Sequence, residues 1–217
     1  MNDELLTQEK YWDSEVNEFD SIYSHGKSKF SNWLDKTFRW DMYARYEFTL
    51  KNSEPISGRS FLDVGCGTGR YSLEYAKRGA GKVIGIDISK EMVKVCNTRA
   101  KKEEFENICT FYQADLTNYK PESLVDVCIG IGLFDYISDA LPVITIMHEV
   151  VTDCAIMSFP RSGTWRAFIR KIRLGMKGCP VYFYSRSKLE KILRDSGFKS
   201  YDIEIVGQLF CVKASIK

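Results

Sequence analysis

A glycine-rich loop that directly follows a short apolar run constrains the fold of this chain more than any other feature. Residues 60–66 read SFLDVGC, an apolar run ending in glycine and cysteine that is typical of a buried strand. The loop continues as GCGTGR over residues 65–70, and residues 71–78 have the pattern of a helix that ends at Gly79. A strand, a glycine loop and a helix in this order predict a ligand-binding turn at the edge of a parallel sheet.

The spacing of these glycines fits neither of two common phosphate-binding loops. A dinucleotide fingerprint requires GxGxxG, but the third glycine is replaced by Arg70 at that position, so the pattern here is GxGxG. The Gly-Lys-Ser/Thr of a phosphate-binding P-loop does not follow. Pyrophosphate binding is therefore disfavoured.

The rest of the chain alternates between strand and helix patterns. Alternation of this kind predicts a parallel sheet with helices on both faces, and the last two runs predict an antiparallel hairpin at its side. The expected strands are residues 82–88, 109–116, 125–134, 153–160, 198–207 and 208–217, and the expected helices begin at Ser89, Ala140 and Ser187.

The first 50 residues differ in composition because they contain eleven aromatic side chains. Two sets recur at helical spacing and predict amphipathic helices that pack on another part of the molecule. Their aromatic stripes are either core or the roof of a ligand pocket. The two sets are Trp12, Val16, Phe19 and Tyr23, and Trp33, Thr37, Trp40 and Ala44.

The stretch between Pro160 and Pro180 interrupts the alternation and predicts a basic amphipathic helix over residues 161–177. A solvated charged face is the plain interpretation, and an anion site for substrate or a membrane surface are the alternatives. The apolar side holds Trp165, Phe168, Ile169, Ile172 and Met176, and the basic side holds Arg166, Arg170, Arg173 and Lys177.

Carboxylates follow or end three successive strands of the predicted sheet. Asp87 ends the second strand, 22 residues beyond Gly65, where a carboxylate can accept both hydroxyls of a ribose. Asp115 ends the third strand, where it can accept from an exocyclic amino group such as that of adenine. Together with Asp63 of the first strand, they predict a nucleoside site at the carboxyl edge.

Composition excludes several other classes of protein. The net charge is +2, with 44% hydrophobic and 28% charged residues, which disfavours a polyanion binder and a disordered chain. The seven cysteines contain no CxxC pair and are predicted to be reduced core residues of a cytoplasmic protein. No apolar run approaches the roughly 20 residues of a membrane span, and no metal site is expected.

The motifs FLDVGCGTG, GID, QADL and VDVCIGIGLFDYISD resemble those of class I S-adenosylmethionine-dependent methyltransferases. The resemblance is carried by residues 60–160. The carboxyl end of the chain, YSRSKLEKILRDSGF followed by two strands, is also similar to that family. A looser similarity links the N-terminal YWDSEVNEFDSIY to the aromatic lid of small-molecule members. The resemblance implies a Rossmann-like, doubly wound α/β sheet of seven mostly parallel strands with an antiparallel last strand. We therefore expect a helical N-terminal extension over residues 1–55 and a methyltransferase domain over residues 56–217, with the basic helical insertion at 161–180.

The resemblance also implies S-adenosylmethionine as the cofactor and assigns residues to it. The methionine portion, the ribose and the adenine would be held at the ends of the first four strands, with Tyr11 as a lid and Arg45 on the cofactor carboxylate. The implied cofactor residues are Tyr11, Arg45, Asp63, Gly65, Cys66, Gly67, Asp87, Ile88, Met92, Asp115, Leu116, Gly130 and Ile131.

On the acceptor side the sequence contains no obvious catalytic dyad, and in-line methyl transfer does not require one. The candidates are His25 as a base, Asp135 and Tyr136 after the fourth strand, and Arg161 after the fifth, which favours an anionic acceptor if it faces the cleft. The (D/N)PP(Y/F) motif of amino-methylating nucleic-acid enzymes is replaced by IGLF at residues 131–134.

We therefore predict a methyltransferase for a small molecule, acting at oxygen. Two alternatives remain: an RNA or protein methyltransferase that docks through the 161–177 helix, and a non-catalytic S-adenosylmethionine-binding protein. The sequence leaves the acceptor and the oligomeric state open.

Overall fold

A seven-stranded sheet forms the centre of the computed structural model, which describes residues 6–14, 16, 32–115, 117–119, 121–163 and 180–217. The strand order is β3-β2-β1-β4-β5-β7-β6. β2 and β3 are added on one side of β1, whereas β4 and β5 are added on the other. The point between β1 and β4, where the strand order switches sides, is where open α/β sheets bind ligands. The strands are β1 (Ser60–Val64), β2 (Lys82–Asp87), β3 (Cys109–Gln113), β4 (Val125–Gly130), β5 (Val151–Pro160), β6 (Ser200–Val206) and β7 (Leu209–Ser215).

The pairing directions confirm the predicted fold class. β1 pairs in parallel with β2 and β4, β2 with β3, and β4 with β5, whereas β7 runs antiparallel to both β5 and β6. The sheet is thus the Rossmann-like arrangement of seven mostly parallel strands with a reversed last strand. The hairpin turns at Gly207, whose φ of 56° lies in the left-handed region that favours glycine.

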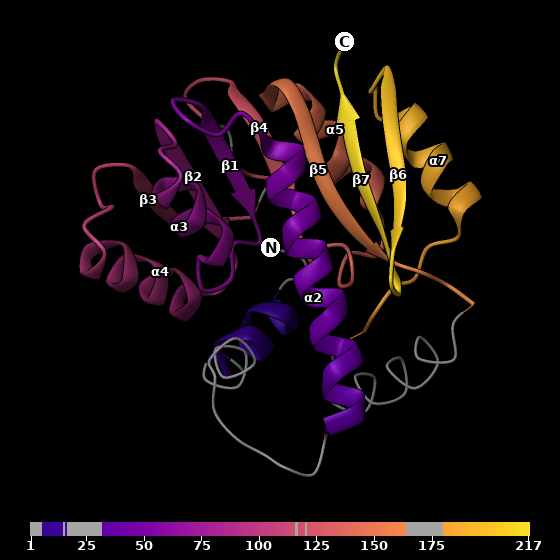
Figure 1. Ribbon diagram of the computed structural model, residues 1–217, viewed down its shortest axis with the longest axis horizontal. Helices are drawn as coiled ribbons and strands as arrows, with labels where there is room; N and C mark the ends of the chain where they lie inside the picture. Colours follow the sequence, from indigo (N-terminus) through magenta and orange to yellow (C-terminus); the bar gives the residue numbers. More distant parts are fainter. Residues whose placement is uncertain (1–5, 15, 17–31, 116, 120, 164–179) are drawn as a thin grey trace.

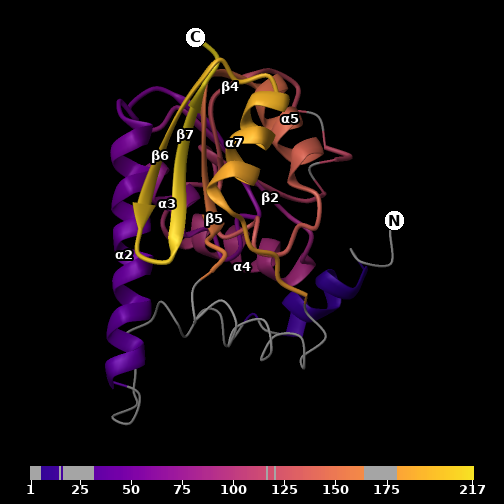
Figure 2. The same ribbon diagram turned by 90° about the vertical axis from the view of Figure 1, so that its right-hand side faces the viewer.

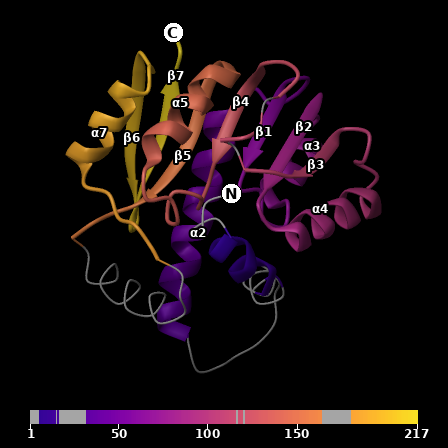
Figure 3. The same ribbon diagram turned by 180° about the vertical axis from the view of Figure 1, so that it is seen from behind.

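Helices cover both faces of this sheet (Figures 1 and 2). α2 (Asn32–Ser53), α3 (Arg70–Lys77) and α4 (Lys90–Lys102) lie on one face, and α5 (Ala140–Val150) and α7 (Arg186–Asp195) lie on the other, which Figure 3 shows from behind. Serine or aspartate side chains cap three of these helices: Ser89 for α4, Asp139 for α5 and Ser185 for α7.

The sheet separates two apolar layers because successive side chains of a strand point to opposite faces. On the α3 side, Phe61 stacks on Tyr75 with ring centroids 4.1 Å apart, and both side chains are fully buried. On the α5 side, Phe134 stacks on Phe159 at 4.4 Å. These layers hold the strands in place and leave their carboxyl ends at one edge, the lower edge in Figure 1.

The long helix α2 corrects one expectation about the N-terminal aromatics. Trp40, which the helical spacing placed on a packing stripe, is 57% exposed, and Tyr43 is 51% exposed. The buried face of α2 instead contains Met42, Phe48 and Leu50. Residues at helical spacing predicted the helix, but the face it buries is set by the β5–β7–β6 surface on which it lies.

Residues 164–179, and with them most of the predicted basic helix, lie outside the described residues. Among the described residues, none of the helices has the length and apolar character needed to span a bilayer. The division into an N-terminal extension and a domain that begins at residue 56 stays a prediction.

Candidate functional site

The glycine loop closes tightly over the carboxyl end of β1. Gly65 and Gly67 have φ angles of 70° and 53°, which strongly favour glycine. The Gly65 and Cys66 amides donate to the Ile86 carbonyl oxygen of β2 at 2.8 and 3.1 Å. These N–H groups are therefore bonded within the protein and are not free to donate to a ligand at this edge.

The Asp87 carboxylate lies beside this loop, at the end of β2 as predicted. Its Oδ2 accepts from the Gly67 amide and its Oδ1 from the Ser89 amide, both at 2.9 Å. Burial raises the pKa of Asp87, and the two amide donors act in the opposite direction. Each carboxylate oxygen has a second lone pair, so the group can accept from the two hydroxyls of a ribose and still hold the loop.

The Asp63 carboxylate is turned away from the open edge and toward α3. It is 2% exposed, and its Oδ2 accepts from the Ser72 hydroxyl at 2.6 Å. Burial raises its pKa from 3.8 to about 7, the Ser72 hydrogen bond opposes this, and the charge of Asp87 adds to it. Asp63 therefore lies behind the glycine loop, with its carboxylate directed at α3.

The described residues provide no ion pair for either Asp63 or Asp87. When ionised, two buried carboxylates that have no cationic partner among the described residues create a negative potential at the loop. A ligand that carries positive charge would relieve it. This feature fits the sulfonium and amine of S-adenosylmethionine better than it fits a phosphate.

Asp115 lies two residues beyond β3, in a turn. It accepts from the Thr117 amide at 3.2 Å, from the Thr117 hydroxyl, and from the Asn118 amide group at 3.3 Å. The Ala114 amide donates to the Asp87 carbonyl oxygen at 2.9 Å, which ties this turn to the end of β2. Asp115 is therefore placed on the same edge as Asp87, with its carboxylate partly engaged in shaping the turn.

The other residues predicted on this side of the edge differ in exposure. Ile88 is half-buried, and its carbonyl oxygen accepts from Gln113 Nε2 at 3.1 Å. Met92 is 2% exposed within α4 and packs in the interior. Leu116 lies outside the described residues.

A helical segment over residues 6–14 lies across the carboxyl edge, below the sheet in Figure 1. The Ser89 hydroxyl donates to Asp13 Oδ1 at 2.5 Å and also accepts from the Met92 amide at 3.1 Å. Gln113 Nε2 donates to Glu9 Oε1 at 2.9 Å. These contacts join the segment to the ends of β2 and β3.

The same segment also reaches the residues that follow β4. Gln8 Nε2 donates to the Tyr136 carbonyl oxygen at 2.7 Å. The Trp12 ring meets the Tyr136 ring edge-on, with centroids 5.0 Å apart, and Tyr11 meets Trp12 in the same way at 5.2 Å. Residues 6–14 therefore bridge both sides of the switch point, as a cover over the edge would.

Sequence reasoning missed Gln8 and Asp13 as contributors to this site. Their partners lie 128 and 76 residues further along the chain, and no local pattern encodes such contacts. The sequence predicted Ser89 only as a helix cap.

The segment after β4 contains the remaining predicted cofactor residues. Gly130 ends β4 and is buried, and Ile131 is half-buried. The next amide, that of Gly132, donates to the buried Ser158 hydroxyl at 2.9 Å. Arg45 of α2 reaches this point, because a Cβ placed on Gly132 would lie 3.4 Å from Arg45 Nη1. The structure thus brings Arg45 to the strand end where the resemblance placed the methionine portion.

The predicted acceptor-side residues lie in different surroundings. Asp135 is 4% exposed, and its carbonyl oxygen accepts from the Tyr182 amide at 2.8 Å. Burial and then the Asp135 charge raise the pKa of Tyr184, whose hydroxyl donates to the Ile137 carbonyl oxygen at 3.1 Å. Asp135 therefore lies in the interior near Tyr184, whereas Tyr136 lies beneath residues 6–14.

Arg161 is bound to the β6–β7 turn. Its Nη1 donates to the Gly207 carbonyl oxygen at 3.1 Å, and its guanidinium carbon lies 5.4 Å from the centroid of the Phe210 ring. His25 lies outside the described residues. No group of three or more metal-ligating side chains occurs in the described part of the chain.

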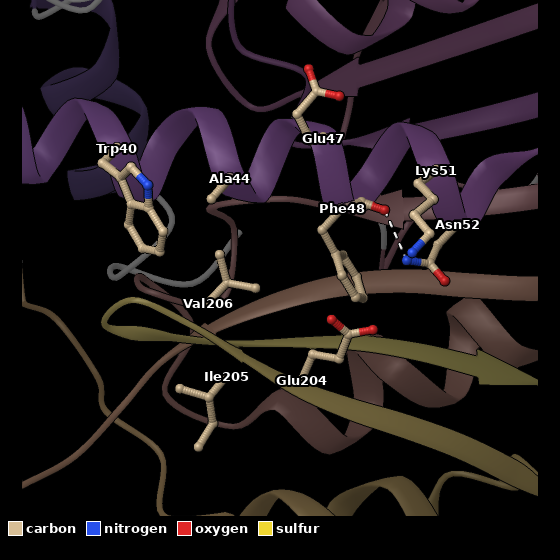
Figure 4. Close-up of a pocket in the computed structure, with 9 residues that line it drawn as sticks. All are labelled: Trp40, Ala44, Glu47, Phe48, Lys51, Asn52, Glu204, Ile205 and Val206. Carbon is tan, nitrogen blue, oxygen red and sulfur yellow. Dashed lines mark hydrogen bonds between the residues drawn. The ribbon is translucent and has the colours of Figure 1, made fainter.

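A groove of about 310 Å³ lies elsewhere, between α2 and β6 (Figure 4). Trp40, Phe48 and Ile205 form much of its apolar lining. It shares no residue with the glycine loop or with Asp87, and it contains none of the predicted site residues. We assign the chemistry to the carboxyl edge because the carboxylates and the glycine loop meet there.

Comparisons with known proteins identify the family of this chain. Residues 56–197 match the family model described as a methyltransferase domain. The chain is 28% identical to demethylmenaquinone methyltransferase of Geobacillus sp. (strain WCH70), over 90% of this chain and 92% of that protein. It is 29% identical to ubiquinone biosynthesis O-methyltransferase of Vibrio campbellii, over 69% of this chain and 58% of that protein. Three other curated relatives are matched over less than half of their own length.

Solved structures show the same fold. Magnesium protoporphyrin IX methyltransferase from Synechocystis PCC 6803, crystallised with bound S-adenosylmethionine, superposes with a TM-score of 0.78 at 21% identity. That match covers 100% of this chain and 99% of the other. Since the family model spans well over half of the chain, the protein belongs to the methyltransferase domain family and is a class I S-adenosylmethionine-dependent methyltransferase.

Proposed function

We propose that this methyltransferase acts on a small molecule and transfers the methyl group to an oxygen atom. The observation that carries the proposal is the helical segment 6–14, which is pinned across the carboxyl edge by contacts to the ends of β2 and β3 and to the residues after β4. A segment in this position encloses the site, which suits an acceptor small enough to lie beneath it and excludes water from the reaction.

The names of the relatives that match most of this chain support the same class of acceptor. Demethylmenaquinone, an intermediate of ubiquinone biosynthesis and magnesium protoporphyrin IX are small molecules, and the ubiquinone enzyme is an O-methyltransferase. The basic 161–177 helix, on which an RNA or protein acceptor would depend, lies largely outside the described residues. No described feature therefore favours a macromolecular acceptor over a small one.

On the cofactor side, we assign the ribose hydroxyls to Asp87 and the methionine amine to the backbone of Gly65 and Gly67. Asp63 supplies negative charge from behind the loop, and Arg45 binds the carboxylate near the end of β4. When bound, S-adenosylmethionine supplies an electrophilic methyl group on a sulfonium. The adenine side is assigned to Ile88, Asp115 and Leu116, with Tyr11 in the cover. Cys66, Met92, Gly130 and Ile131 complete the proposed set.

The protein's main task in this reaction is alignment. Positioning the acceptor oxygen, the methyl carbon and the sulfur in one line contributes several kcal/mol to catalysis. Tyr136 lies beneath the cover and is the described residue we favour for contact with the acceptor. Asp135, His25 and Arg161 remain candidates for proton removal or for binding an anionic acceptor.

Incubation of the purified enzyme with methyl-labelled S-adenosylmethionine and fractionated cell extract tests the proposal. We expect the label in a small-molecule product, identified by mass spectrometry, and we expect hydriodic acid to release it as methyl iodide, as it does from methyl ethers and esters. An Asp87→Ala variant is the negative control. Label found only in protein or RNA, or bound to carbon, would contradict the proposal.

We further propose a cytoplasmic location. The six described cysteines are free thiols, which fits a reducing compartment.

A further inference from the structure

Two thiols lie in contact directly beneath the glycine loop. Cys66 belongs to the loop and Cys96 to α4, and their sulfur atoms are 3.9 Å apart. Cys66 is 7% exposed and Cys96 is fully buried. The Cys109 thiol nearby points elsewhere and contacts the Ser72 carbonyl oxygen at 3.7 Å. Thirty residues separate the members of the pair in sequence, and the fold brings them together at the proposed cofactor site.

The pair is linked to the Asp87 carboxylate through a single residue. Cys96 Sγ donates to the Gly67 carbonyl oxygen at 3.1 Å, and the Gly67 amide donates to Asp87 Oδ2 at 2.9 Å. A change in the state of these thiols would therefore alter the position of Gly67. Through Gly67 it would alter the carboxylate that we assign to the ribose.

We propose that Cys66 and Cys96 are an oxidative modification site, at which a peroxide forms a disulfide that lowers the affinity for the cofactor. The effect on affinity rests on the proposed placement of the cofactor, whereas the disulfide itself does not. The sulfur of one cysteine attacks a peroxide oxygen to give a sulfenic acid and one water. The sulfur of the other then displaces the hydroxyl group, which leaves as a second water with the remaining thiol proton. One hydrogen peroxide is reduced, and two thiols are oxidised.

The geometry explains why the bond would disturb the loop. A disulfide holds its sulfurs about 2.05 Å apart, so the pair must approach by roughly 2 Å. Oxidation also removes the Cys96 thiol hydrogen, and the Gly67 carbonyl oxygen loses that donor. The loop is then drawn toward α4 while one of its anchors is lost.

The surroundings of Cys66 make the reaction slow. The hydrogen bond with Cys96 and burial both raise the pKa of Cys66, so little thiolate is present near neutral pH. We therefore expect oxidation over minutes to hours in millimolar peroxide, faster at higher pH and slower when the cofactor product S-adenosylhomocysteine occupies the site.

Peptide mapping tests the disulfide directly. Trypsin cleavage after Arg59, Arg70, Lys94 and Arg99 places the two cysteines in peptides 60–70 and 95–99. After treatment with hydrogen peroxide and alkylation of the remaining thiols, mass spectrometry should find these two peptides joined, with a loss of two hydrogens. Dithiothreitol should separate them.

Calorimetry with S-adenosylhomocysteine tests the consequence. Oxidation should weaken binding at least tenfold in the wild type and in Cys109→Ser, and reduction should restore it. Cys96→Ser keeps a hydroxyl donor for Gly67, so it should bind normally and lose no affinity on oxidation.

Absence of the joined peptide, or an equal loss of affinity in oxidised Cys96→Ser, would overturn the proposal. A joined peptide with unchanged affinity would overturn the regulatory effect. Failure of the reduced wild type to bind would instead refute the cofactor placement, while the mass measurement would still decide the disulfide.

Discussion

The buried Asp63 carboxylate should make the cofactor-free enzyme less stable as the pH rises. Its pKa is 3.8 in an ordinary setting and about 7 in the folded protein, mainly because burial penalises the charged form. Between these two values the folded state holds a proton that the unfolded state has released, so raising the pH favours unfolding. Below pH 3.8 the group has no effect, and above pH 7 the full cost is present.

The size of the effect follows from the shift in pKa. A rise in pKa from 3.8 to about 7 corresponds to about 4 kcal/mol, because a change of 1 in pKa is worth about 1.36 kcal/mol. The Asp63→Asn variant cannot ionise, and its amide oxygen can still accept from the Ser72 hydroxyl. We therefore expect it to be more stable than the wild type at pH 8, with the difference shrinking toward pH 5.

Urea unfolding followed by circular dichroism at pH 5, 6, 7 and 8 measures this difference. Asp202→Asn, which removes an exposed carboxylate of β6, is the matched control and should follow the wild type at every pH. If the free energies of unfolding of Asp63→Asn and the wild type run parallel from pH 5 to pH 8, the reasoning about Asp63 is wrong.

Three other predictions concern single residues. Asp87→Ala should weaken S-adenosylhomocysteine binding at least tenfold in calorimetry, because a buried hydrogen-bonding partner is lost; unchanged affinity would argue against it as the ribose ligand. Gly207→Ala should lower the free energy of unfolding in urea by about 1–3 kcal/mol, because the new Cβ would overlap Asp41 Oδ1. Gly58→Ala is the control: Gly58 also has a positive φ but has open space around it, so the free energy of unfolding should fall by less. Gln8→Ala should weaken S-adenosylhomocysteine binding roughly threefold to tenfold through loss of about 1 kcal/mol, with little change in thermal stability; equal binding would show that the cover does not contribute.

Local patterns predicted the parts of the fold that are local in sequence. The apolar run before Gly65, the position of Asp87 at a strand end and the Ser89 cap each follow from a few adjacent residues, and the structure contains all three. The reversed β7 was expected because the last two strand patterns adjoin directly at Gly207 and Gln208, which leaves room only for a tight turn. The alternation of strand and helix patterns then predicted a sheet with helices on both of its faces.

Features that depend on distant contacts were not predictable in the same way. The exposure of Trp40 depends on which face of α2 meets the sheet, and helical spacing alone does not decide between two aromatic faces. The orientation of Asp63 toward Ser72 depends on how α3 packs behind the loop. The contact of Asp13 with Ser89 joins segments 76 residues apart, and neither residue type signals the other.

A crystal structure of the enzyme with S-adenosylhomocysteine would show whether the cofactor binds at the carboxyl edge of the sheet. We expect the ribose hydroxyls to lie within hydrogen-bond distance of the Asp87 carboxylate and the amine to lie against the loop at Gly65. Density for the nucleoside in the groove between α2 and β6, or at any place away from the carboxyl ends of β1 and β2, would contradict this expectation.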